Sequence, residues 1–156
     1  MNPKEILKKS GLFRELNSLE LLKVTEVCRK RFLPKGSVII SEGEDFEVDT
    51  SLYVIISGLV KVALPLGEGK ELVLNFLGPS DHFGEISFMD ENPRTADVSA
   101  LEDTDLLVID HASMTALLES DRELAIKFYR SVARVLIKYL RSLNEKLLGG
   151  YTSRRR

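Results

Sequence analysis

The feature that most constrains the fold is a series of short, β-branched or alternating apolar runs, each bounded by glycine, proline or acidic residues. The runs cover residues 37–41, 52–57, 59–64, 71–77, 95–100 and 105–109. Several short strands at a spacing of about ten residues are typical of an antiparallel sandwich or barrel. The separators have the composition of turns. We therefore expect a β-roll of the jelly-roll type over about residues 30–110.

Helical periodicity of the apolar residues flanks this segment on both sides. Residues 17–31 predict an amphipathic helix that begins at Asn17 or Ser18. A short helix around residues 114–118 and a longer one over about 121–148 follow the strands. The predicted fold class is α+β, an antiparallel β-roll flanked by an N-terminal helix and a long C-terminal helix.

The long helix is expected to end at Gly149-Gly150, a plausible C-terminal stop. Its apolar residues form a broad stripe, and part of that stripe must cover the β-roll. Over the last four turns they recur at intervals of three and four, which also suits a coiled-coil seam with a second copy and predicts a homodimer. The stripe consists of Leu124, Phe128, Val132, Val135, Leu136, Tyr139, Leu140, Leu143 and Leu147.

Length and composition restrict the class of protein. A chain of 156 residues suits a single domain, here residues 1–150 with C-terminal helices over 111–148 and a basic tail at 151–156. No run is apolar and long enough to span a membrane, and the first residues do not form a secretory signal. The single cysteine, Cys28, excludes an intramolecular disulfide. We expect a cytoplasmic protein.

Charge argues against nucleic acid as a partner of this chain alone. The formal net charge is −2, and the one basic concentration is Arg154-Arg155-Arg156. Three arginines neutralise only a few phosphates, which is too few for tight binding. We expect neither membrane nor DNA binding through this chain.

The segment from Phe83 to Val98 carries the strongest chemical signal. It places Gly84-Glu85 at the start of a one-turn helix and Arg94 nine residues after the glutamate. Glycine lets a ligand approach the backbone closely, and the free N–H groups of a first helical turn suit an anion. Arginine offers a fork of donors matched to phosphate oxygens, and a glutamate accepts from ribose hydroxyls. The segment lacks the lysine of a P-loop, so it favours a nucleotide with a compact phosphate.

These residues resemble the phosphate-binding cassette of the cyclic-nucleotide-binding domain family, whose pattern is Gly-Glu, a variable loop and then Arg-(Ser/Thr/Ala)-Ala. Here the pattern is Gly84-Glu85 followed by Arg94-Thr95-Ala96. The likeness extends from Leu12 to Leu148 and includes the glycine-punctuated strands. It implies a sensor that binds cyclic AMP, needs no cofactor, and signals through movement of its C-terminal helix.

The resemblance also implies roles for several cassette residues. The backbone N–H groups around Ile86 and Ser87 would contact the cyclic phosphate. Gly84 and Glu85 would contact the ribose, with Glu85 on the 2′-hydroxyl. Arg94 would pair with the phosphate, assisted by Thr95, a residue that the family associates loosely with tolerance of cyclic GMP. The implied ligand-binding residues are Phe83, Gly84, Glu85, Ile86, Ser87, Arg94, Thr95, Ala96 and Tyr139.

Two departures from the family pattern affect the expected site. The connection at residues 44–50 is longer than the usual turn and is expected to protrude. Tyr139 and Leu140 stand near the positions where catabolite activator protein has small hydroxyl residues facing the adenine. Tyr139 would cover the base without hydrogen bonding to its edge.

Other candidate residues have simpler interpretations. His82 and His111 lack the spacing of metal ligands and are expected to be surface or capping residues. Cys28 is expected on the apolar face of the first helix. No nucleophile–base pair or metal set has convincing spacing, so we expect no enzymatic activity and no metal. Arg94 could also be a structural arginine that pairs with Glu85.

Two alternatives to a cyclic-nucleotide sensor remain open at this point. The chain could be a truncated transcription regulator of the catabolite-activator and fumarate-nitrate-regulator type, without its helix-turn-helix domain. It could also be a ligand-free scaffold that keeps the fold for dimerisation. The intact cassette disfavours the scaffold, because packing alone does not need that combination of residues.

Overall fold

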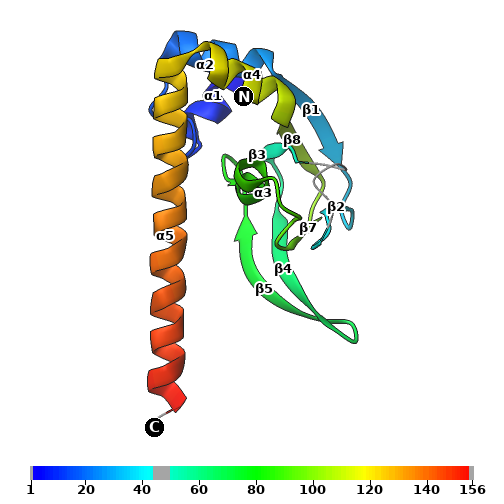
Figure 1. The fold of residues 1–156 in the computed structure, drawn as a ribbon. Coiled ribbons are helices and arrows are strands. Elements are labelled where there is room, and N and C mark those ends of the chain that lie inside the picture. Colours follow the sequence, from blue (N-terminus) through cyan, green and yellow to red (C-terminus); the bar gives the residue numbers. More distant parts are fainter. Residues whose placement is uncertain (1, 44–49, 155–156) are drawn as a thin grey trace.

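The computed structural model describes residues 2–43 and 50–154, with side chains up to residue 150. Its centre is a β-roll made of two four-stranded antiparallel sheets, ordered β1-β8-β3-β6 and β2-β7-β4-β5 (Figure 1). The strands are β1 (Cys28–Leu33), β2 (Val38–Ile40), β3 (Leu52–Ser57), β4 (Val60–Gly67), β5 (Lys70–Leu77), β6 (His82–Phe83), β7 (Asp97–Ala100) and β8 (Thr104–Ile109).

Five helices accompany these strands in the described part of the chain. They are α1 (Pro3–Lys9), α2 (Ser18–Glu26), α3 (Glu85–Asp90), α4 (His111–Ser120) and α5 (Arg122–Arg154). Helices α1, α2 and α4 lie together at one end of the roll, and α5 extends from that end as a long rod (Figure 1). The predicted α+β class and the β-roll are confirmed.

Strand β8 separates two hydrophobic cores, because successive side chains of a strand point to opposite faces. Leu106 and Val108 face the interior of the roll, where they pack with Tyr53 of β3. Leu107 and Ile109 face the helices and join their core. The roll is therefore filled from within and covered by helices on one outer face.

The first half of α5 is anchored in the helical core. Leu124, Phe128 and Val132 are buried there, and Phe128 stacks on Phe13 with ring centroids 5.7 Å apart. Lys127 Nζ also lies 2.7 Å from Glu20 Oε1 of α2. Two kinds of contact, apolar and ionic, thus fix the base of the long helix.

The N-terminal prediction is correct at its start and wrong at its end. Asn17 caps α2 in a capping box with Glu20, as expected. The helix ends at Glu26, however, and the predicted helical residues beyond it enter β1, which pairs with β8 from Cys28↔Ile109 to Leu33↔Thr104. Tertiary pairing overrides the local periodicity here. The short helix α1 was not predicted.

Cys28 therefore lies in β1 and not on a helix, which corrects its predicted position. Its side chain still packs against the helical core, and Sγ lies 3.2 Å from the Val24 carbonyl oxygen. Burial raises the pKa of the Cys28 thiol to about 12. The expected packing role is retained in a different element.

The C-terminal helix is longer than predicted. It continues through Gly149 and Gly150 to Arg154, so the first part of the predicted tail is helical. Glycine weakens a helix interior by only about 1 kcal/mol. A C-terminal stop of this kind needs a residue in the left-handed conformation, which neither Gly149 nor Gly150 adopts.

Among the described residues, no helix combines the length and the apolar character that crossing a membrane requires.

Candidate functional site

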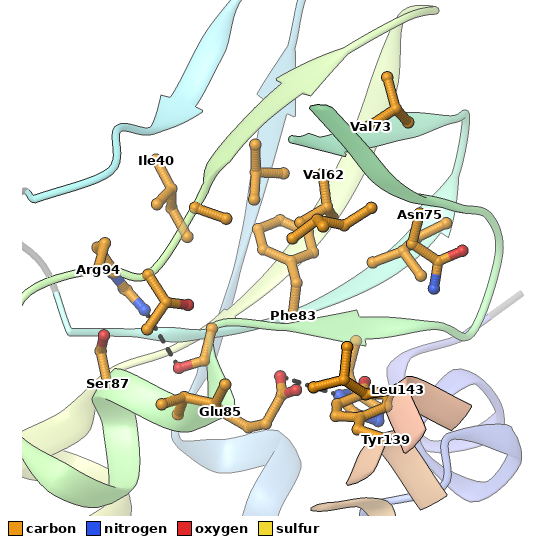
Figure 2. Close-up of a pocket in the computed structure, with 18 of the residues that line it drawn as sticks. Ile40, Val62, Val73, Asn75, Phe83, Glu85, Ser87, Arg94, Tyr139 and Leu143 are labelled. Atoms are coloured by element: carbon orange, nitrogen blue, oxygen red, sulfur yellow. Dashed lines mark hydrogen bonds and ion pairs between the residues drawn. The ribbon is translucent and has the colours of Figure 1, made fainter. Parts of the chain in front are cut away.

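A cavity of about 620 Å³ lies between the β-roll, helix α3 and the second half of α5. Figure 2 shows its residues converging from the strands on one side and from Tyr139 and Leu143 of α5 on the other. All nine residues of the predicted site line this one cavity, although they come from a cassette and a helix more than forty positions apart in the sequence. Whether they bind a ligand stays a prediction.

Gly84 sets the geometry of the cassette. Strand β6 pairs with β3 through Tyr53↔Phe83 and Val54↔His82, and Gly84 then turns the chain into α3 with a φ of 90°. A Cβ atom added at Gly84 would lie 2.9 Å from both Arg94 Nη1 and the Ser51 carbonyl oxygen. Glycine is therefore required here for backbone conformation and for space.

Arg94 is held rigidly in the cavity wall. Its side chain is almost fully buried, and Nη1 donates to the Gly84 carbonyl oxygen at 3.1 Å while Nη2 donates to the Ser51 carbonyl oxygen at 2.9 Å. These two bonds fix the plane of the guanidinium beside the turn into α3. A planar cation fixed in this way suits a phosphate group.

Glu85 is a buried carboxylate that lines the cavity. Its Oε2 lies 3.3 Å from Nδ1 of His82, and only 8% of its side chain is exposed. Tyr139 approaches from α5 (Figure 2). Burial raises the pKa of Tyr139, and the nearby negative charge of Glu85 adds to the effect. Glu85 thus links the cassette to the long helix.

The remaining predicted residues complete the walls. Phe83 stacks on Tyr53 with ring centroids 4.9 Å apart and closes the floor of the cavity. Ser87 and Ala96 are buried, whereas Ile86 and Thr95 reach the surface of the site. The cassette therefore presents a mixed polar and apolar surface of the kind a nucleotide needs.

Sequence reasoning missed part of the site. His82 was expected at the surface or as a cap, but only 8% of it is exposed and it lines the cavity. Ser142, Leu143 and Lys146 were not predicted as site residues, although they follow Tyr139 at helical spacing and line the cavity beside it. Counting three, four and seven residues on from Tyr139 could have found them.

Two further predictions concern residues near the site. His111 does begin α4, where Asp110 is the cap, and its Nε2 lies 3.6 Å from Glu91 Oε1. The predicted protruding connection falls almost entirely on residues 44–49, which lie outside the described residues.

Comparisons with known proteins identify the family to which this fold belongs. A family model described as cyclic nucleotide-binding domain matches residues 30–121. A CRP-like cAMP-activated global transcriptional regulator of Mycobacterium tuberculosis is 30% identical over 92% of this chain and 61% of its own length. The chain belongs to the cyclic nucleotide-binding domain family.

Solved structures of related proteins have the same fold as this chain. The catabolite activator protein of Thermus thermophilus is 30% identical and superposes with a TM-score of 0.77, covering 88% of this chain and 62% of its own. The regulatory domain of Toxoplasma gondii PKA, crystallised with cAMP, is 29% identical with a TM-score of 0.66, covering 73% of this chain and 42% of its own. This chain thus corresponds to part of each longer relative.

Proposed function

We propose that this chain binds a cyclic nucleotide, with cyclic AMP as the favoured ligand, and is a sensor without enzymatic activity. The observation that carries the proposal is one cavity in which a buried arginine, a glycine turn and a buried carboxylate lie side by side. A cyclic nucleotide presents a phosphate next to a ribose hydroxyl, which is the arrangement these groups complement.

The phosphate end of the ligand would occupy the glycine turn. Arg94 would pair with the phosphate oxygens, assisted by the hydroxyl of Thr95. The backbone N–H groups of Ile86 and Ser87 belong to the first turn of α3, where helical geometry supplies no acceptor. Gly84 has no Cβ atom, which would lie 2.9 Å from Arg94 Nη1, so the guanidinium can lie beside this turn.

The ribose and the base would occupy the rest of the cavity. Glu85 would accept a hydrogen bond from the 2′-hydroxyl, and Tyr139 would cover the base from α5. Cyclic AMP is favoured because the Mycobacterium tuberculosis relative is described as cAMP-activated and the Toxoplasma gondii domain was crystallised with cAMP. Thr95 keeps cyclic GMP as the alternative ligand.

Binding would shift the position of α5, because this helix contributes Tyr139, Ser142 and Leu143 to the cavity. A ligand that contacts the cassette and α5 together favours the conformations in which the two are close. Its differential affinity for closed and open forms would then drive the signal.

A second copy of this chain is the proposed partner of α5. Leu136, Leu140, Leu143 and Leu147 are exposed and recur at intervals of four, three and four. That spacing forms a coiled-coil seam, and identical seams on two copies complement each other. A cytoplasmic location, and no binding of membrane or DNA by this chain alone, stay predictions.

Calorimetric titration of cyclic AMP and cyclic GMP tests the proposal. We expect saturable binding that Arg94→Ala weakens by about two orders of magnitude, because the substitution removes a buried partner of the phosphate. Arg29→Ala is the matched control, since Arg29 is exposed on β1 and is not among the cavity residues. Thermal melting checks that both variants are folded.

The opposite result is equally informative. If neither nucleotide binds the wild-type chain, or if Arg94→Ala binds as tightly as Arg29→Ala, the sensor proposal is wrong. The ligand-free scaffold would then account better for the fold.

A further inference from the structure

The contact between His82 and Glu85 gives the histidine a role that the residue pattern did not predict. Both side chains are more than nine-tenths buried, and His82 Nδ1 lies 3.3 Å from Glu85 Oε2. His82 belongs to β6, whose register is set by the Val54↔His82 pair with β3. The histidine backbone is therefore fixed by the sheet, and the side chain reaches the carboxylate from there.

The chemistry of this contact determines which atom carries the hydrogen. An ionised carboxylate only accepts hydrogen bonds, so Nδ1 must be the protonated nitrogen for the contact to be favourable. Each oxygen of a carboxylate can accept independently. A donor on Oε2 therefore leaves Oε1 available to a second donor and restricts rotation of the group.

We propose that His82 is a positioning residue, which donates from Nδ1 to Glu85 Oε2 and thereby holds Oε1 as the acceptor for a ribose 2′-hydroxyl. This inference rests on the proposed function, because it concerns how the same site recognises the sugar. His82 itself does not contact the ligand in this scheme. It acts on affinity through Glu85 alone.

The surroundings of Glu85 explain why such a residue is needed. Tyr139 of α5 also lies close to the carboxylate (Figure 2) and can offer its phenol to the same oxygens. Without the histidine donor, the carboxylate could rotate and direct both oxygens toward the tyrosine phenol. That rotation would weaken it as an acceptor for the ribose.

The test compares two ligands that differ only at the position in question, cyclic AMP and 2′-deoxy cyclic AMP. In the wild-type chain we expect the deoxy ligand to bind about tenfold more weakly, since a hydrogen bond to a charged group is lost. A merely structural role for His82 would change the affinity of both ligands equally. The ratio of the two dissociation constants therefore isolates the contribution of the 2′-hydroxyl.

His82→Asn and His82→Gln are the matched variants. The asparagine amide nitrogen can occupy the place of Nδ1, whereas the longer glutamine side chain carries its amide nitrogen toward the place of Nε2. We expect His82→Asn to keep the tenfold ratio and His82→Gln to reduce it to about threefold or less. An unchanged ratio in both variants would overturn the inference, and so would an equal loss in both.

A measurement on the wild-type chain covers the case in which a variant does not fold. Nitrogen-15 NMR of the imidazole distinguishes the two ring nitrogens, and we expect His82 Nδ1 to carry hydrogen. A tautomer protonated on Nε2 only would overturn the inference. Failure of the proposed function has another signature, namely no binding of any of these nucleotides to the wild-type chain.

Discussion

The two halves of helix α5 have the same apolar spacing but opposite environments. In the first half, Leu124 and Phe128 are fully buried against the helical core. In the second half, Leu143 and Leu147 are 54% and 65% exposed. Figure 1 shows the helix leaving the body of the molecule between these two regions. A periodic apolar stripe therefore indicates that a helix has a partner, but not whether that partner is in the same chain.

The buried and exposed halves of α5 also have different roles. The buried half contributes to the stability of the domain, whereas the exposed half borders the cavity through Tyr139 and carries the proposed seam for a second copy. A ligand at the cavity and a partner at the seam act on the same stretch of helix. Substitutions in the two halves should consequently alter different measurements.

The largest expected effect comes from replacing a leucine with alanine in the buried half of α5, compared with the same substitution in the exposed half. Leu124→Ala should lower the free energy of unfolding by about 3 kcal/mol, because it leaves a cavity in the core. Leu147→Ala should change it by less than about 0.5 kcal/mol in dilute solution, as expected for an exposed position. Urea unfolding followed by circular dichroism measures both. Equal effects would mean that the second half is as well packed as the first.

The second-largest expected effect is on self-association, which substitutions in the exposed half of α5 should weaken. The double substitution Leu140→Glu/Leu147→Glu should raise the dissociation constant of the dimer by at least about a hundredfold, since a charge in an apolar seam is costly to bury. Lys138→Gln/Glu145→Gln, at exposed positions with the same spacing, is the control and should leave it unchanged. Sedimentation velocity distinguishes monomer from dimer. A wild-type chain that is monomeric at every concentration would refute the seam.

The smallest expected effect concerns Gly149 and Gly150. Replacing both with alanine should stabilise the last turns of α5 by about 1 kcal/mol for each residue, without changing the melting temperature of the domain. Hydrogen exchange of the backbone amides in these turns should slow by about fivefold or more for each glycine. Unchanged exchange would indicate that these turns are already held by another contact.

The cassette part of the site was predictable from the sequence because its residues are close together in the chain. Gly84, Glu85 and Arg94 fall within a short segment whose residue types are needed for a phosphate and a sugar. His82 has no such signal. Its burial results from the pairing of β6 with β3 and from α5 above it, which are contacts between distant segments.

Two errors of prediction in the N-terminal part of the chain, strand β1 and helix α1, have the same cause. Strand β1 has four exposed residues between its ends and no apolar alternation, so only its pairing with β8 defines it as a strand. Helix α1 has just two buried residues, Ile6 and Leu7, within seven. Such short segments take their structure from what they pack against. The strands other than β1 and β6 were predictable because they carry their own β-branched or alternating apolar pattern.

One ionic contact at the base of α5 has a mechanical consequence. Glu20 Oε1 accepts both from the backbone N–H of Asn17 and from Lys127 Nζ, so the N-terminal cap of α2 and the first turns of α5 share a single carboxylate. If α5 rotates about this contact, the helix beyond it acts as a lever arm. At 1.5 Å per residue, Tyr139 lies about 18 Å along the arm and Arg154 about 40 Å. A rotation that moves the helix by about 1.5 Å at the cavity would therefore displace its far end by about 3.5 Å.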